Sequence, residues 1–279
     1  MSFGRVLAKA KVRFIDQNPI RVFWNYRSFI WRAALQDLRY RYAGSALGVF
    51  WNVLLPLAQI LIYTAVFSTI MPVRLPGREG AHGFAIYLCA GLLPWMGFSE
   101  CISRGTNCFI ENANYLKKLP IPEQVFVARN AATATLSLVV SMSLLFPMTI
   151  FLGGRITWAW LSVAPVIMLL QCLGFGLGLT LGSLNVFFRD ISQVLGTVLQ
   201  MWMWLTPIVY LKEILPGSLR RVLPINPVFP FVDALQGVIV RGEWPETQAW
   251  GLMALWSLIA PLIGYLVLRK LRPEIRDVV

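Results

Sequence analysis

The sequence contains few of the residues that build catalytic or metal-binding sites. Its 279 residues include one histidine, His82, and four cysteines, Cys89, Cys101, Cys108 and Cys172, none of which are spaced as Cys-x-x-Cys. The motifs HExxH and GxSxG are missing, as is any group of His, Cys and carboxylate residues at metal-ligand spacing. We therefore expect no catalytic residue, bound cofactor or metal in this chain. The cysteines are expected to be free thiols that pack as small apolar side chains.

Apolar residues, by contrast, are abundant. They make up 57% of the chain, and the mean hydropathy is +0.64, whereas they make up roughly half of a typical soluble domain. The formal net charge of +12 would also suit a nucleic-acid-binding protein, but the basic residues stand at the ends of apolar runs and form no continuous patch. The chain is therefore predicted to be an all-α integral membrane protein without a nucleic-acid partner.

The sequence also lacks a phosphate-binding loop and is poor in carboxylates. No GxxxxGK[ST] motif occurs, so the chain is not expected to bind ATP by that loop. Glu100 is the only carboxylate well inside an apolar run, and Arg104 follows four residues later, so an i, i+4 ion pair is expected. So few ionisable groups within the membrane argue against a proton-coupled transporter and against an enzyme with a buried acid and base.

Six apolar runs are long enough to cross a membrane, which takes about 20 residues for a hydrocarbon core of roughly 30 Å. They lie near residues 47–71, 84–103, 131–152, 157–187, 191–211 and 249–268. The whole chain, residues 1–279, is therefore expected to form one transmembrane domain. Its parts are a cytoplasmic or interfacial segment at 1–46, a six-helix bundle at 47–268 and a cytoplasmic tail at 269–279.

The N-terminal segment is strongly basic and contains an amphipathic helix. Residues 1–45 include nine Lys or Arg against Asp16 and Asp37. Helical spacing places on one side the residues Val22, Tyr26, Phe29, Ile30, Ala33 and Ala34. A basic helix with aromatic anchors is expected to lie in the plane of the lipid headgroups. An ordinary solvated helix is the alternative.

The basic residues also indicate the orientation in the membrane. Lys and Arg number 18 in the N-terminal segment, the second and fourth loops and the tail, against 7 in the other three loops. Because basic loops stay in the cytoplasm, both termini are expected to be cytoplasmic.

Glycines recur at four-residue spacing in the fourth run, at Gly174, Gly178 and Gly182, with Gly176 between them. A dinucleotide-binding loop would need a preceding strand, and this run is a spanning helix. The spacing instead predicts close helix packing, against another helix of the chain or against a second subunit.

The fifth loop, residues 212–248, contains five prolines and a thirteen-residue apolar run, VFPFVDALQGVIV. Thirteen residues are too few to span a membrane. A re-entrant or interfacial hairpin on the outer face is therefore expected, since a disordered loop would contain fewer large apolar residues.

The second loop contains a candidate contact site for a soluble partner. Residues 111–119 can form a short helix that two prolines end, and this helix would present Tyr115 and Leu116 beside two lysines. A short helix between two spanning helices can transmit force from a partner. A loop that the lysines merely hold at the headgroups is the alternative.

Several stretches together resemble the membrane subunits of ABC transporters that export polysaccharides, the family of O-antigen, capsule and teichoic acid export permeases. These stretches are DLRYRYAGSALGVFWNVLLPL, ENANYLKKLPIP, NVFFRDISQVLGTVLQMWMWLTPIVY and LPINPV. They extend in this order from about residue 37 to 227, which is most of the chain.

The resemblance implies a homodimer in the bacterial cytoplasmic membrane, bound to two copies of a separate ABC ATPase subunit. ATP and Mg²⁺ would bind to that subunit, and this chain would be no enzyme. The short helix would be the coupling helix that docks into the ATPase, with Glu111, Asn112, Asn114, Tyr115, Leu116, Lys117 and Lys118. Arg189 and Asp190 match the family's short cytoplasmic turn, and residues 212–248 match its outer re-entrant helices.

The implied cargo is a lipid-linked glycopolymer, and aromatic rings suit its path because sugar C–H faces stack on them weakly. At about 1.5 Å per residue, Trp202, Trp204 and Trp95 lie near mid-membrane. The expected path residues are Trp202, Trp204, Trp95, Trp51, Asn52 and Gln59. For Trp51, near the inner end of the first run, a place in the interfacial tryptophan belt is the alternative. Being two residues apart, Trp202 and Trp204 point about 200° apart, so at most one of them lines a narrow path. Packing against neighbouring helices or lipid is the alternative for both.

Two other functions stay open at this point. An ABC permease for a drug or a free lipid would share the same machinery. A membrane-embedded sugar or acyl transferase would need an acid, base or metal cluster, which the sequence does not provide.

Overall fold

A computed structural model describes residues 19–67, 83–119 and 121–278, which are helical with irregular connections and contain no strand. The longer helices are α2 (Pro19–Tyr40), α3 (Trp51–Ala65), α4 (Gly83–Glu111), α6 (Glu123–Phe151), α7 (Val163–Asn185), α8 (Asp190–Leu205) and α11 (Thr247–Val278). The short ones are η1 (Gly48–Phe50), α5 (Ala113–Lys118), η3 (Trp158–Ser162), η4 (Lys212–Ile214), α9 (Gly217–Val222), η5 (Leu223–Ile225), α10 (Phe229–Gln236) and η6 (Gly237–Arg241).

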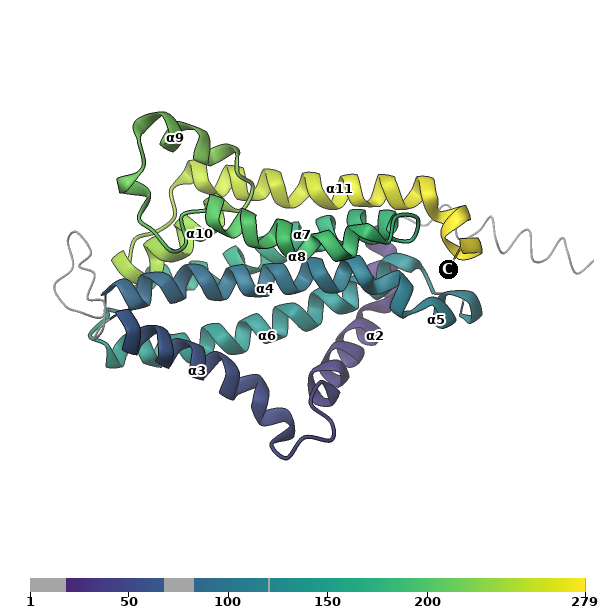
Figure 1. Ribbon diagram of the computed structural model, residues 1–279, viewed down its shortest axis with the longest axis horizontal. Helices are drawn as coiled ribbons and strands as arrows, with labels where there is room; N and C mark the ends of the chain where they lie inside the picture. The colour runs from purple at the N-terminus through teal and green to yellow at the C-terminus, as the bar shows by residue number, and fades with distance from the viewer. Residues whose placement is uncertain (1–18, 68–82, 120, 279) are drawn as a thin grey trace, which may run out of the picture.

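The bundle has two distinct ends. Helices α4, α6, α7, α8 and α11 lie side by side, and α2 and α3 form a V whose tip projects from the bundle (Figure 1). Helix α5 and the end of α11 lie together at one end, which we call the α5 end. Helices α9 and α10 lie at the other, the α10 end. Helix α4 is largely buried among its neighbours, so it is the centre of the subunit.

Five of the described helices are long and apolar enough to cross a membrane: Gly48–Ala65, Gly83–Glu111, Glu123–Phe151, Trp158–Asn185 and Thr247–Ile275. The predicted fifth span, 191–211, is wrong in its extent. Helix α8 has 16 residues, or about 24 Å, and ends at Leu205. Thr206 is extended (φ −101°, ψ 132°) because the residue before a proline, here Pro207, disfavours the helical conformation.

The predicted re-entrant segment corresponds to two helical stretches, Gly217–Ile225 and Phe229–Arg241, which meet at 108°. Phe231, Val232 and Leu235 of α10 are buried in the core, and Lys212 forms an ion pair with Asp233 at 2.5 Å. A sharply bent apolar pair with a buried second half is the geometry expected of a re-entrant hairpin.

The glycines of α7 pack against helices of the same chain, as one of the two predicted arrangements requires. A Cβ on Gly182 would lie 2.5 Å from the backbone oxygen of Gly105 in α4, and one on Gly178 would lie 3.2 Å from the Gly105 Cα. On the other side of α7, a Cβ on Gly176 would lie 2.3 Å from the backbone carbon of Ala260 in α11. Helix α7 is thus held between α4 and α11 so closely that a Cβ on Gly182 or Gly176 would force a backbone to shift.

Candidate functional site

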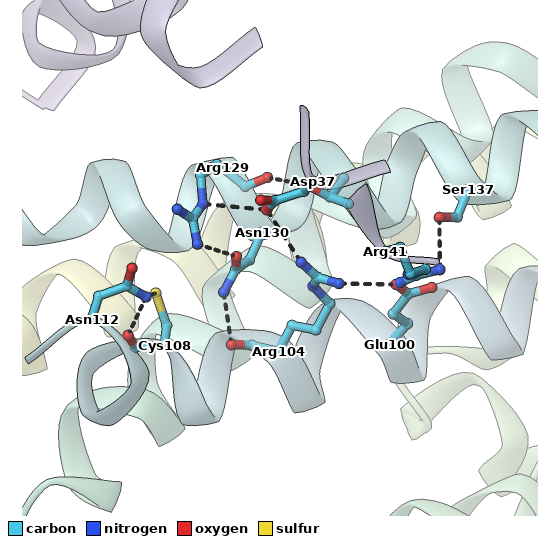
Figure 2. A network of polar contacts seen from close by, with 10 residues as sticks. Asp37, Arg41, Glu100, Arg104, Cys108, Asn112, Arg129, Asn130 and Ser137 are labelled. Carbon is cyan, nitrogen blue, oxygen red and sulfur yellow. Dashed lines mark hydrogen bonds and ion pairs between the residues drawn. The ribbon is translucent and has the colours of Figure 1, made fainter. Parts of the chain in front are cut away.

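The amphipathic helix α2 is fastened to the bundle by Asp37. Its Oδ2 lies 3.3 Å from Arg104 Nη2 and 3.5 Å from Arg129 Nε, and Thr133 Oγ1 donates to it at 3.4 Å. Arg104 belongs to α4 and the other two residues to α6, so one carboxylate joins three helices (Figure 2). This role was not predicted. The sequence does contain a signal for this role. Asp37 comes four residues after Ala33, and this spacing places a carboxylate on the otherwise apolar side of the helix.

The row of ion pairs continues from Arg104 to Arg41. Arg104 Nη1 lies 3.8 Å from Glu100 Oε1, which confirms the predicted i, i+4 pair. Arg41 Nη2 contacts the same oxygen, and its Nη1 donates to Ser137 Oγ at 3.4 Å. Figure 2 shows the resulting row of alternating charges, which runs from Arg129 to Arg41.

Arg41 stands where the chain leaves α2 for α3. Burial, and then the charge of Arg104, lower the pKa of its guanidinium, while Tyr42 and the charge of Asp37 partly oppose this shift. Arg41 also forms an ion pair with Glu100. Nearby, Asn52 Nδ2 donates to the backbone oxygen of Leu38 at 3.0 Å. The junction of α2 and α3 is therefore attached to the bundle by an ion pair and braced by a hydrogen bond between the two helices.

The predicted short helix is present as α5. Glu111 ends α4, and Asn112 forms the turn, with its backbone N–H and its Nδ2 donating to the Cys108 oxygen at 3.1 and 2.8 Å. Leu119 is extended (φ −108°, ψ 137°) because the next residue is a proline. The helix is therefore shorter than the predicted range, and Glu111 and Asn112 precede it.

One side of α5 packs against the bundle, and the other is exposed. Leu116 is only 1% exposed and belongs to an apolar cluster with Phe109, Phe126 and Ile275. The expectation that Leu116 is presented to a partner is therefore wrong, because this apolar side chain is drawn into the cluster. The exposed side chains are Asn114, Tyr115, Lys117 and Lys118. They form a polar face with one aromatic ring.

A buried ion pair lies at the start of α6, the next helix after α5. Glu123, the first residue of α6, is fully buried, and Arg272 Nε and Nη2 both lie 2.6 Å from its Oε2. Arg272 is available because α11 continues as a helix beyond its predicted end at residue 268. Residues 269–275 of the predicted tail are thus part of the packed α5 end.

The turn between α7 and α8 contains the predicted Arg189 and Asp190, which are both exposed. Asp190 begins α8, where a negative charge stabilises the positive end of the helix dipole. Asn185 joins this turn to α4: its Nδ2 donates to the Thr106 oxygen at 3.0 Å, and its Oδ1 accepts from the Ser192 N–H at 3.2 Å.

Trp202 and Trp95, two predicted path residues, lie inside the subunit. Their rings pack edge to face at 5.9 Å between centroids, and Trp202 meets Phe98 at 5.7 Å. Trp202 Nε1–H also donates to Asn226 Oδ1 at 2.9 Å, and Trp95 is 4% exposed. Trp95 is thus a core residue, and the half-buried Trp202 packs against the core.

Trp204 lies on the opposite side of α8 and is 55% exposed. Gln193, Thr197 and Gln200 are exposed as well. Together the four residues follow each other at intervals of four, three and four, which places them along one face of the helix. We call this face the α8 stripe. Its three polar members were not predicted, although their spacing is a signal in the sequence.

Trp51, Asn52 and Gln59, the other predicted path residues, line one cavity of about 330 Å³ between α3, α4 and α6. Arg41 and Glu100 line it too. The outward face of α3 is apolar and exposed, with Val53, Leu54, Leu61 and Ile62. The polar face of α3 therefore points into the subunit and away from its surface.

Comparison with known families decides the classification. The model of the ABC-2 type transporter family matches residues 28–240, from within α2 to η6, which is well over half of the chain. The chain belongs to the ABC-2 type transporter family. The ABC-2 match includes α5, the α8 stripe, the cavity and the re-entrant segment. It ends before α11, so the Arg272 side of the buried ion pair lies outside it.

This ABC-2 transporter chain is similar to permeases of nearly its own length. It is 29% identical over 248 residues to the O-antigen export system permease protein RfbA of Myxococcus xanthus, covering 88% of this chain and 92% of that one. It is 24% identical to an RfbA of Klebsiella pneumoniae, with coverages of 87% and 92%. It is 25% identical to the polysialic acid transport protein KpsM of Escherichia coli, with coverages of 86% and 92%.

Proposed function

We propose that this chain is the membrane subunit of an ATP-driven exporter that moves a lipid-linked polysaccharide across the bacterial cytoplasmic membrane. The relatives whose names state a cargo act on O-antigen and on polysialic acid, and both are polysaccharides. The family itself fixes the transporter class.

The observation that carries the proposal is the α8 stripe. Exposed amide groups such as those of Gln193 and Gln200 are costly to place against hydrocarbon, because nothing there accepts or donates hydrogen bonds. A water-filled path removes that cost. The amides and the Thr197 hydroxyl would hold water beside the polymer, and the Trp204 ring would offer a flat face to sugar C–H groups.

A second copy of the chain would complete the path. One subunit leaves the stripe open on one side, and a two-fold axis would place two stripes face to face. Beside the stripe, α8 exposes the apolar residues Val194, Val198, Met201 and Leu205. These residues suit a subunit contact or lipid, so the polar path would be flanked by apolar surface.

The exposed face of α5 is the proposed docking site for a separate ABC ATPase subunit, with two copies of the ATPase bound to the dimer. Tyr115 would insert into the partner, and Lys117 and Lys118 would pair with its acidic groups. ATP and Mg²⁺ would bind to the ATPase. Because Leu116 is packed into the bundle, a push on α5 would move α4 and α6.

The proposal includes an orientation with both termini and the α5 end in the cytoplasm. The distribution of Lys and Arg supports it, and so does the position of α5 and the end of α11 at the same end of the bundle (Figure 1). The re-entrant α9–α10 segment would then face outwards.

Deletion and complementation in the producing bacterium test the function. We expect the deletion strain to accumulate the lipid-linked polysaccharide inside and to lose it from the surface, as measured by lectin or antibody staining with and without permeabilisation. A plasmid copy restores surface polymer. Unchanged surface polymer in the deletion strain would refute the proposal and favour a drug or a free lipid as the cargo.

A further inference from the structure

The cavity behind α3 contains a buried polar atom without a hydrogen-bond partner, beside several further polar groups. Asn52 Oδ1 is buried and has no hydrogen-bond partner among the described residues. Gln59, Ser137 and Ser141 line the same space. The Ser137 hydroxyl accepts from Arg41, and the Ser141 hydroxyl donates to the Ser137 backbone oxygen. Buried polar atoms are normally hydrogen-bonded, so the unpartnered Asn52 Oδ1 indicates that water or a ligand occupies the cavity.

The charges in the cavity wall balance each other. Arg41 and Glu100 both line it and are paired with one another. A phosphate or another anion would have to compete with Glu100 for Arg41, and a cation would have to compete with Arg41 for Glu100. An uncharged ligand with hydroxyl groups does not compete for either charge. Its hydroxyls can accept hydrogen bonds from spare N–H groups of the Arg41 guanidinium and donate to spare acceptor positions of the Glu100 carboxylate.

The size and the remaining wall fit a single ring. A volume of about 330 Å³ lies at the low end of the range for small-molecule sites. Tyr42 and Trp51 contribute aromatic surface, and Leu93 and Met96 contribute apolar surface. A pyranose has this combination of properties, because its rim carries hydroxyls and its two faces carry C–H groups.

We propose that each subunit binds one uncharged sugar unit of the exported polysaccharide in this cavity, through Asn52, Gln59, Arg41 and Glu100. The proposal rests on the proposed function. It concerns recognition and not passage, because the cavity lies inside one subunit, between α3, α4 and α6, whereas the α8 stripe lies on the surface. The site would select a polymer by one of its sugar units.

Photo-crosslinking in the producing cells tests the location. The photoreactive residue p-benzoylphenylalanine replaces Gln59 in the cavity, Trp204 on the α8 stripe, or Ile62 on the outward face of α3 as the matched control. We expect adducts with the polysaccharide at positions 59 and 204 and none at 62. An adduct at 204 alone would overturn the cavity proposal and leave the function standing. Adducts at none of the positions would count against both the cavity proposal and the proposed function. A phospholipid adduct at position 59 would show that the cavity binds a lipid and not a sugar.

A small substitution tests the same site without filling the cavity. Gln59→Leu keeps the size of the side chain and removes its donor and acceptor. In the purified complex with the ATPase, we expect it to raise the concentration of released polysaccharide fragments needed for half-maximal ATPase stimulation about tenfold. Ile62→Leu should leave that concentration unchanged. An unchanged concentration in Gln59→Leu would overturn the proposal.

Discussion

Arg272, near the end of α11, holds the fully buried carboxylate of Glu123, the first residue of α6, through two nitrogen atoms that each lie 2.6 Å from Oε2. Glu123 follows shortly after α5, the helix that we assign to ATPase docking. The contact therefore ties α11 to the start of α6, the helix that follows the proposed docking helix in the chain.

Breaking this pair should destabilise the chain, because it takes from the fully buried carboxylate of Glu123 the positive charge that lies next to it. We expect Arg272→Met to lower the free energy of unfolding by about 3 kcal/mol, measured by unfolding of the purified chain in detergent. Glu123→Gln should cost less, since its amide can still accept a hydrogen bond from Arg272. The loss of unfolding free energy in the double variant should be smaller than the sum of the losses in the two single variants. Strict additivity would show that the two side chains do not stabilise each other.

The two sides of α5 should respond differently to substitution. Tyr115→Ala and Lys117→Glu should reduce co-purification with the ATPase and leave the chain folded, because both side chains are exposed. Leu116→Ala should lower the free energy of unfolding by about 3 kcal/mol, since it opens a cavity in the apolar cluster. Normal ATPase binding by both surface variants would contradict the docking assignment.

The two tryptophans of α8 should also differ. Trp202→Ala removes the contacts with Trp95, Phe98 and Asn226 and should lower stability by about 3 kcal/mol, seen as a reduced protein level and a lower Tm. Trp204→Ala should leave the protein level unchanged and reduce surface polysaccharide several-fold. Trp158→Ala is the matched control, since Trp158 is 81% exposed but lies outside α8. Equal export by the Trp204 and Trp158 variants would remove Trp204 from the path.

Close packing of α7 should make Gly176 intolerant of even a methyl group. A Cβ there would lie 2.3 Å from the Ala260 backbone carbon, so Gly176→Ala should force α7 and α11 apart and cost about 2 kcal/mol. At Gly251, where a Cβ would meet nothing within 4 Å, the same substitution should be neutral or slightly stabilising. Equal Tm values for the two variants would contradict this packing.

The local features of the fold could be predicted from the sequence, because they depend on neighbouring residues. Five of the spans follow from apolar runs, and the pairing of Glu100 with Arg104 follows from their spacing. The end of α8 could have been predicted from Thr206 and Pro207, since a proline acts on the residue before it. Its predicted extension to residue 211 came from hydropathy alone, which does not register that break.

The long-range features could not be predicted in this way. The partners of Asp37 are residues 104 and 129, and no local pattern relates positions so far apart. Similarly, helical geometry places Trp202 and Trp204 on opposite sides, but only the packed rings of Trp95 and Phe98 determine which one faces inwards.

Transport by the purified complex tests the central claim most directly. The chain is reconstituted with its ATPase in inside-out vesicles, and a radiolabelled lipid-linked polysaccharide from the producing cells is added outside. We predict that label becomes protected inside the vesicles only with hydrolysable ATP, and that Trp204→Ala slows this several-fold while Trp158→Ala does not. Protection that is independent of ATP, or a complex that moves a drug or a free lipid but not the polysaccharide, would contradict the account.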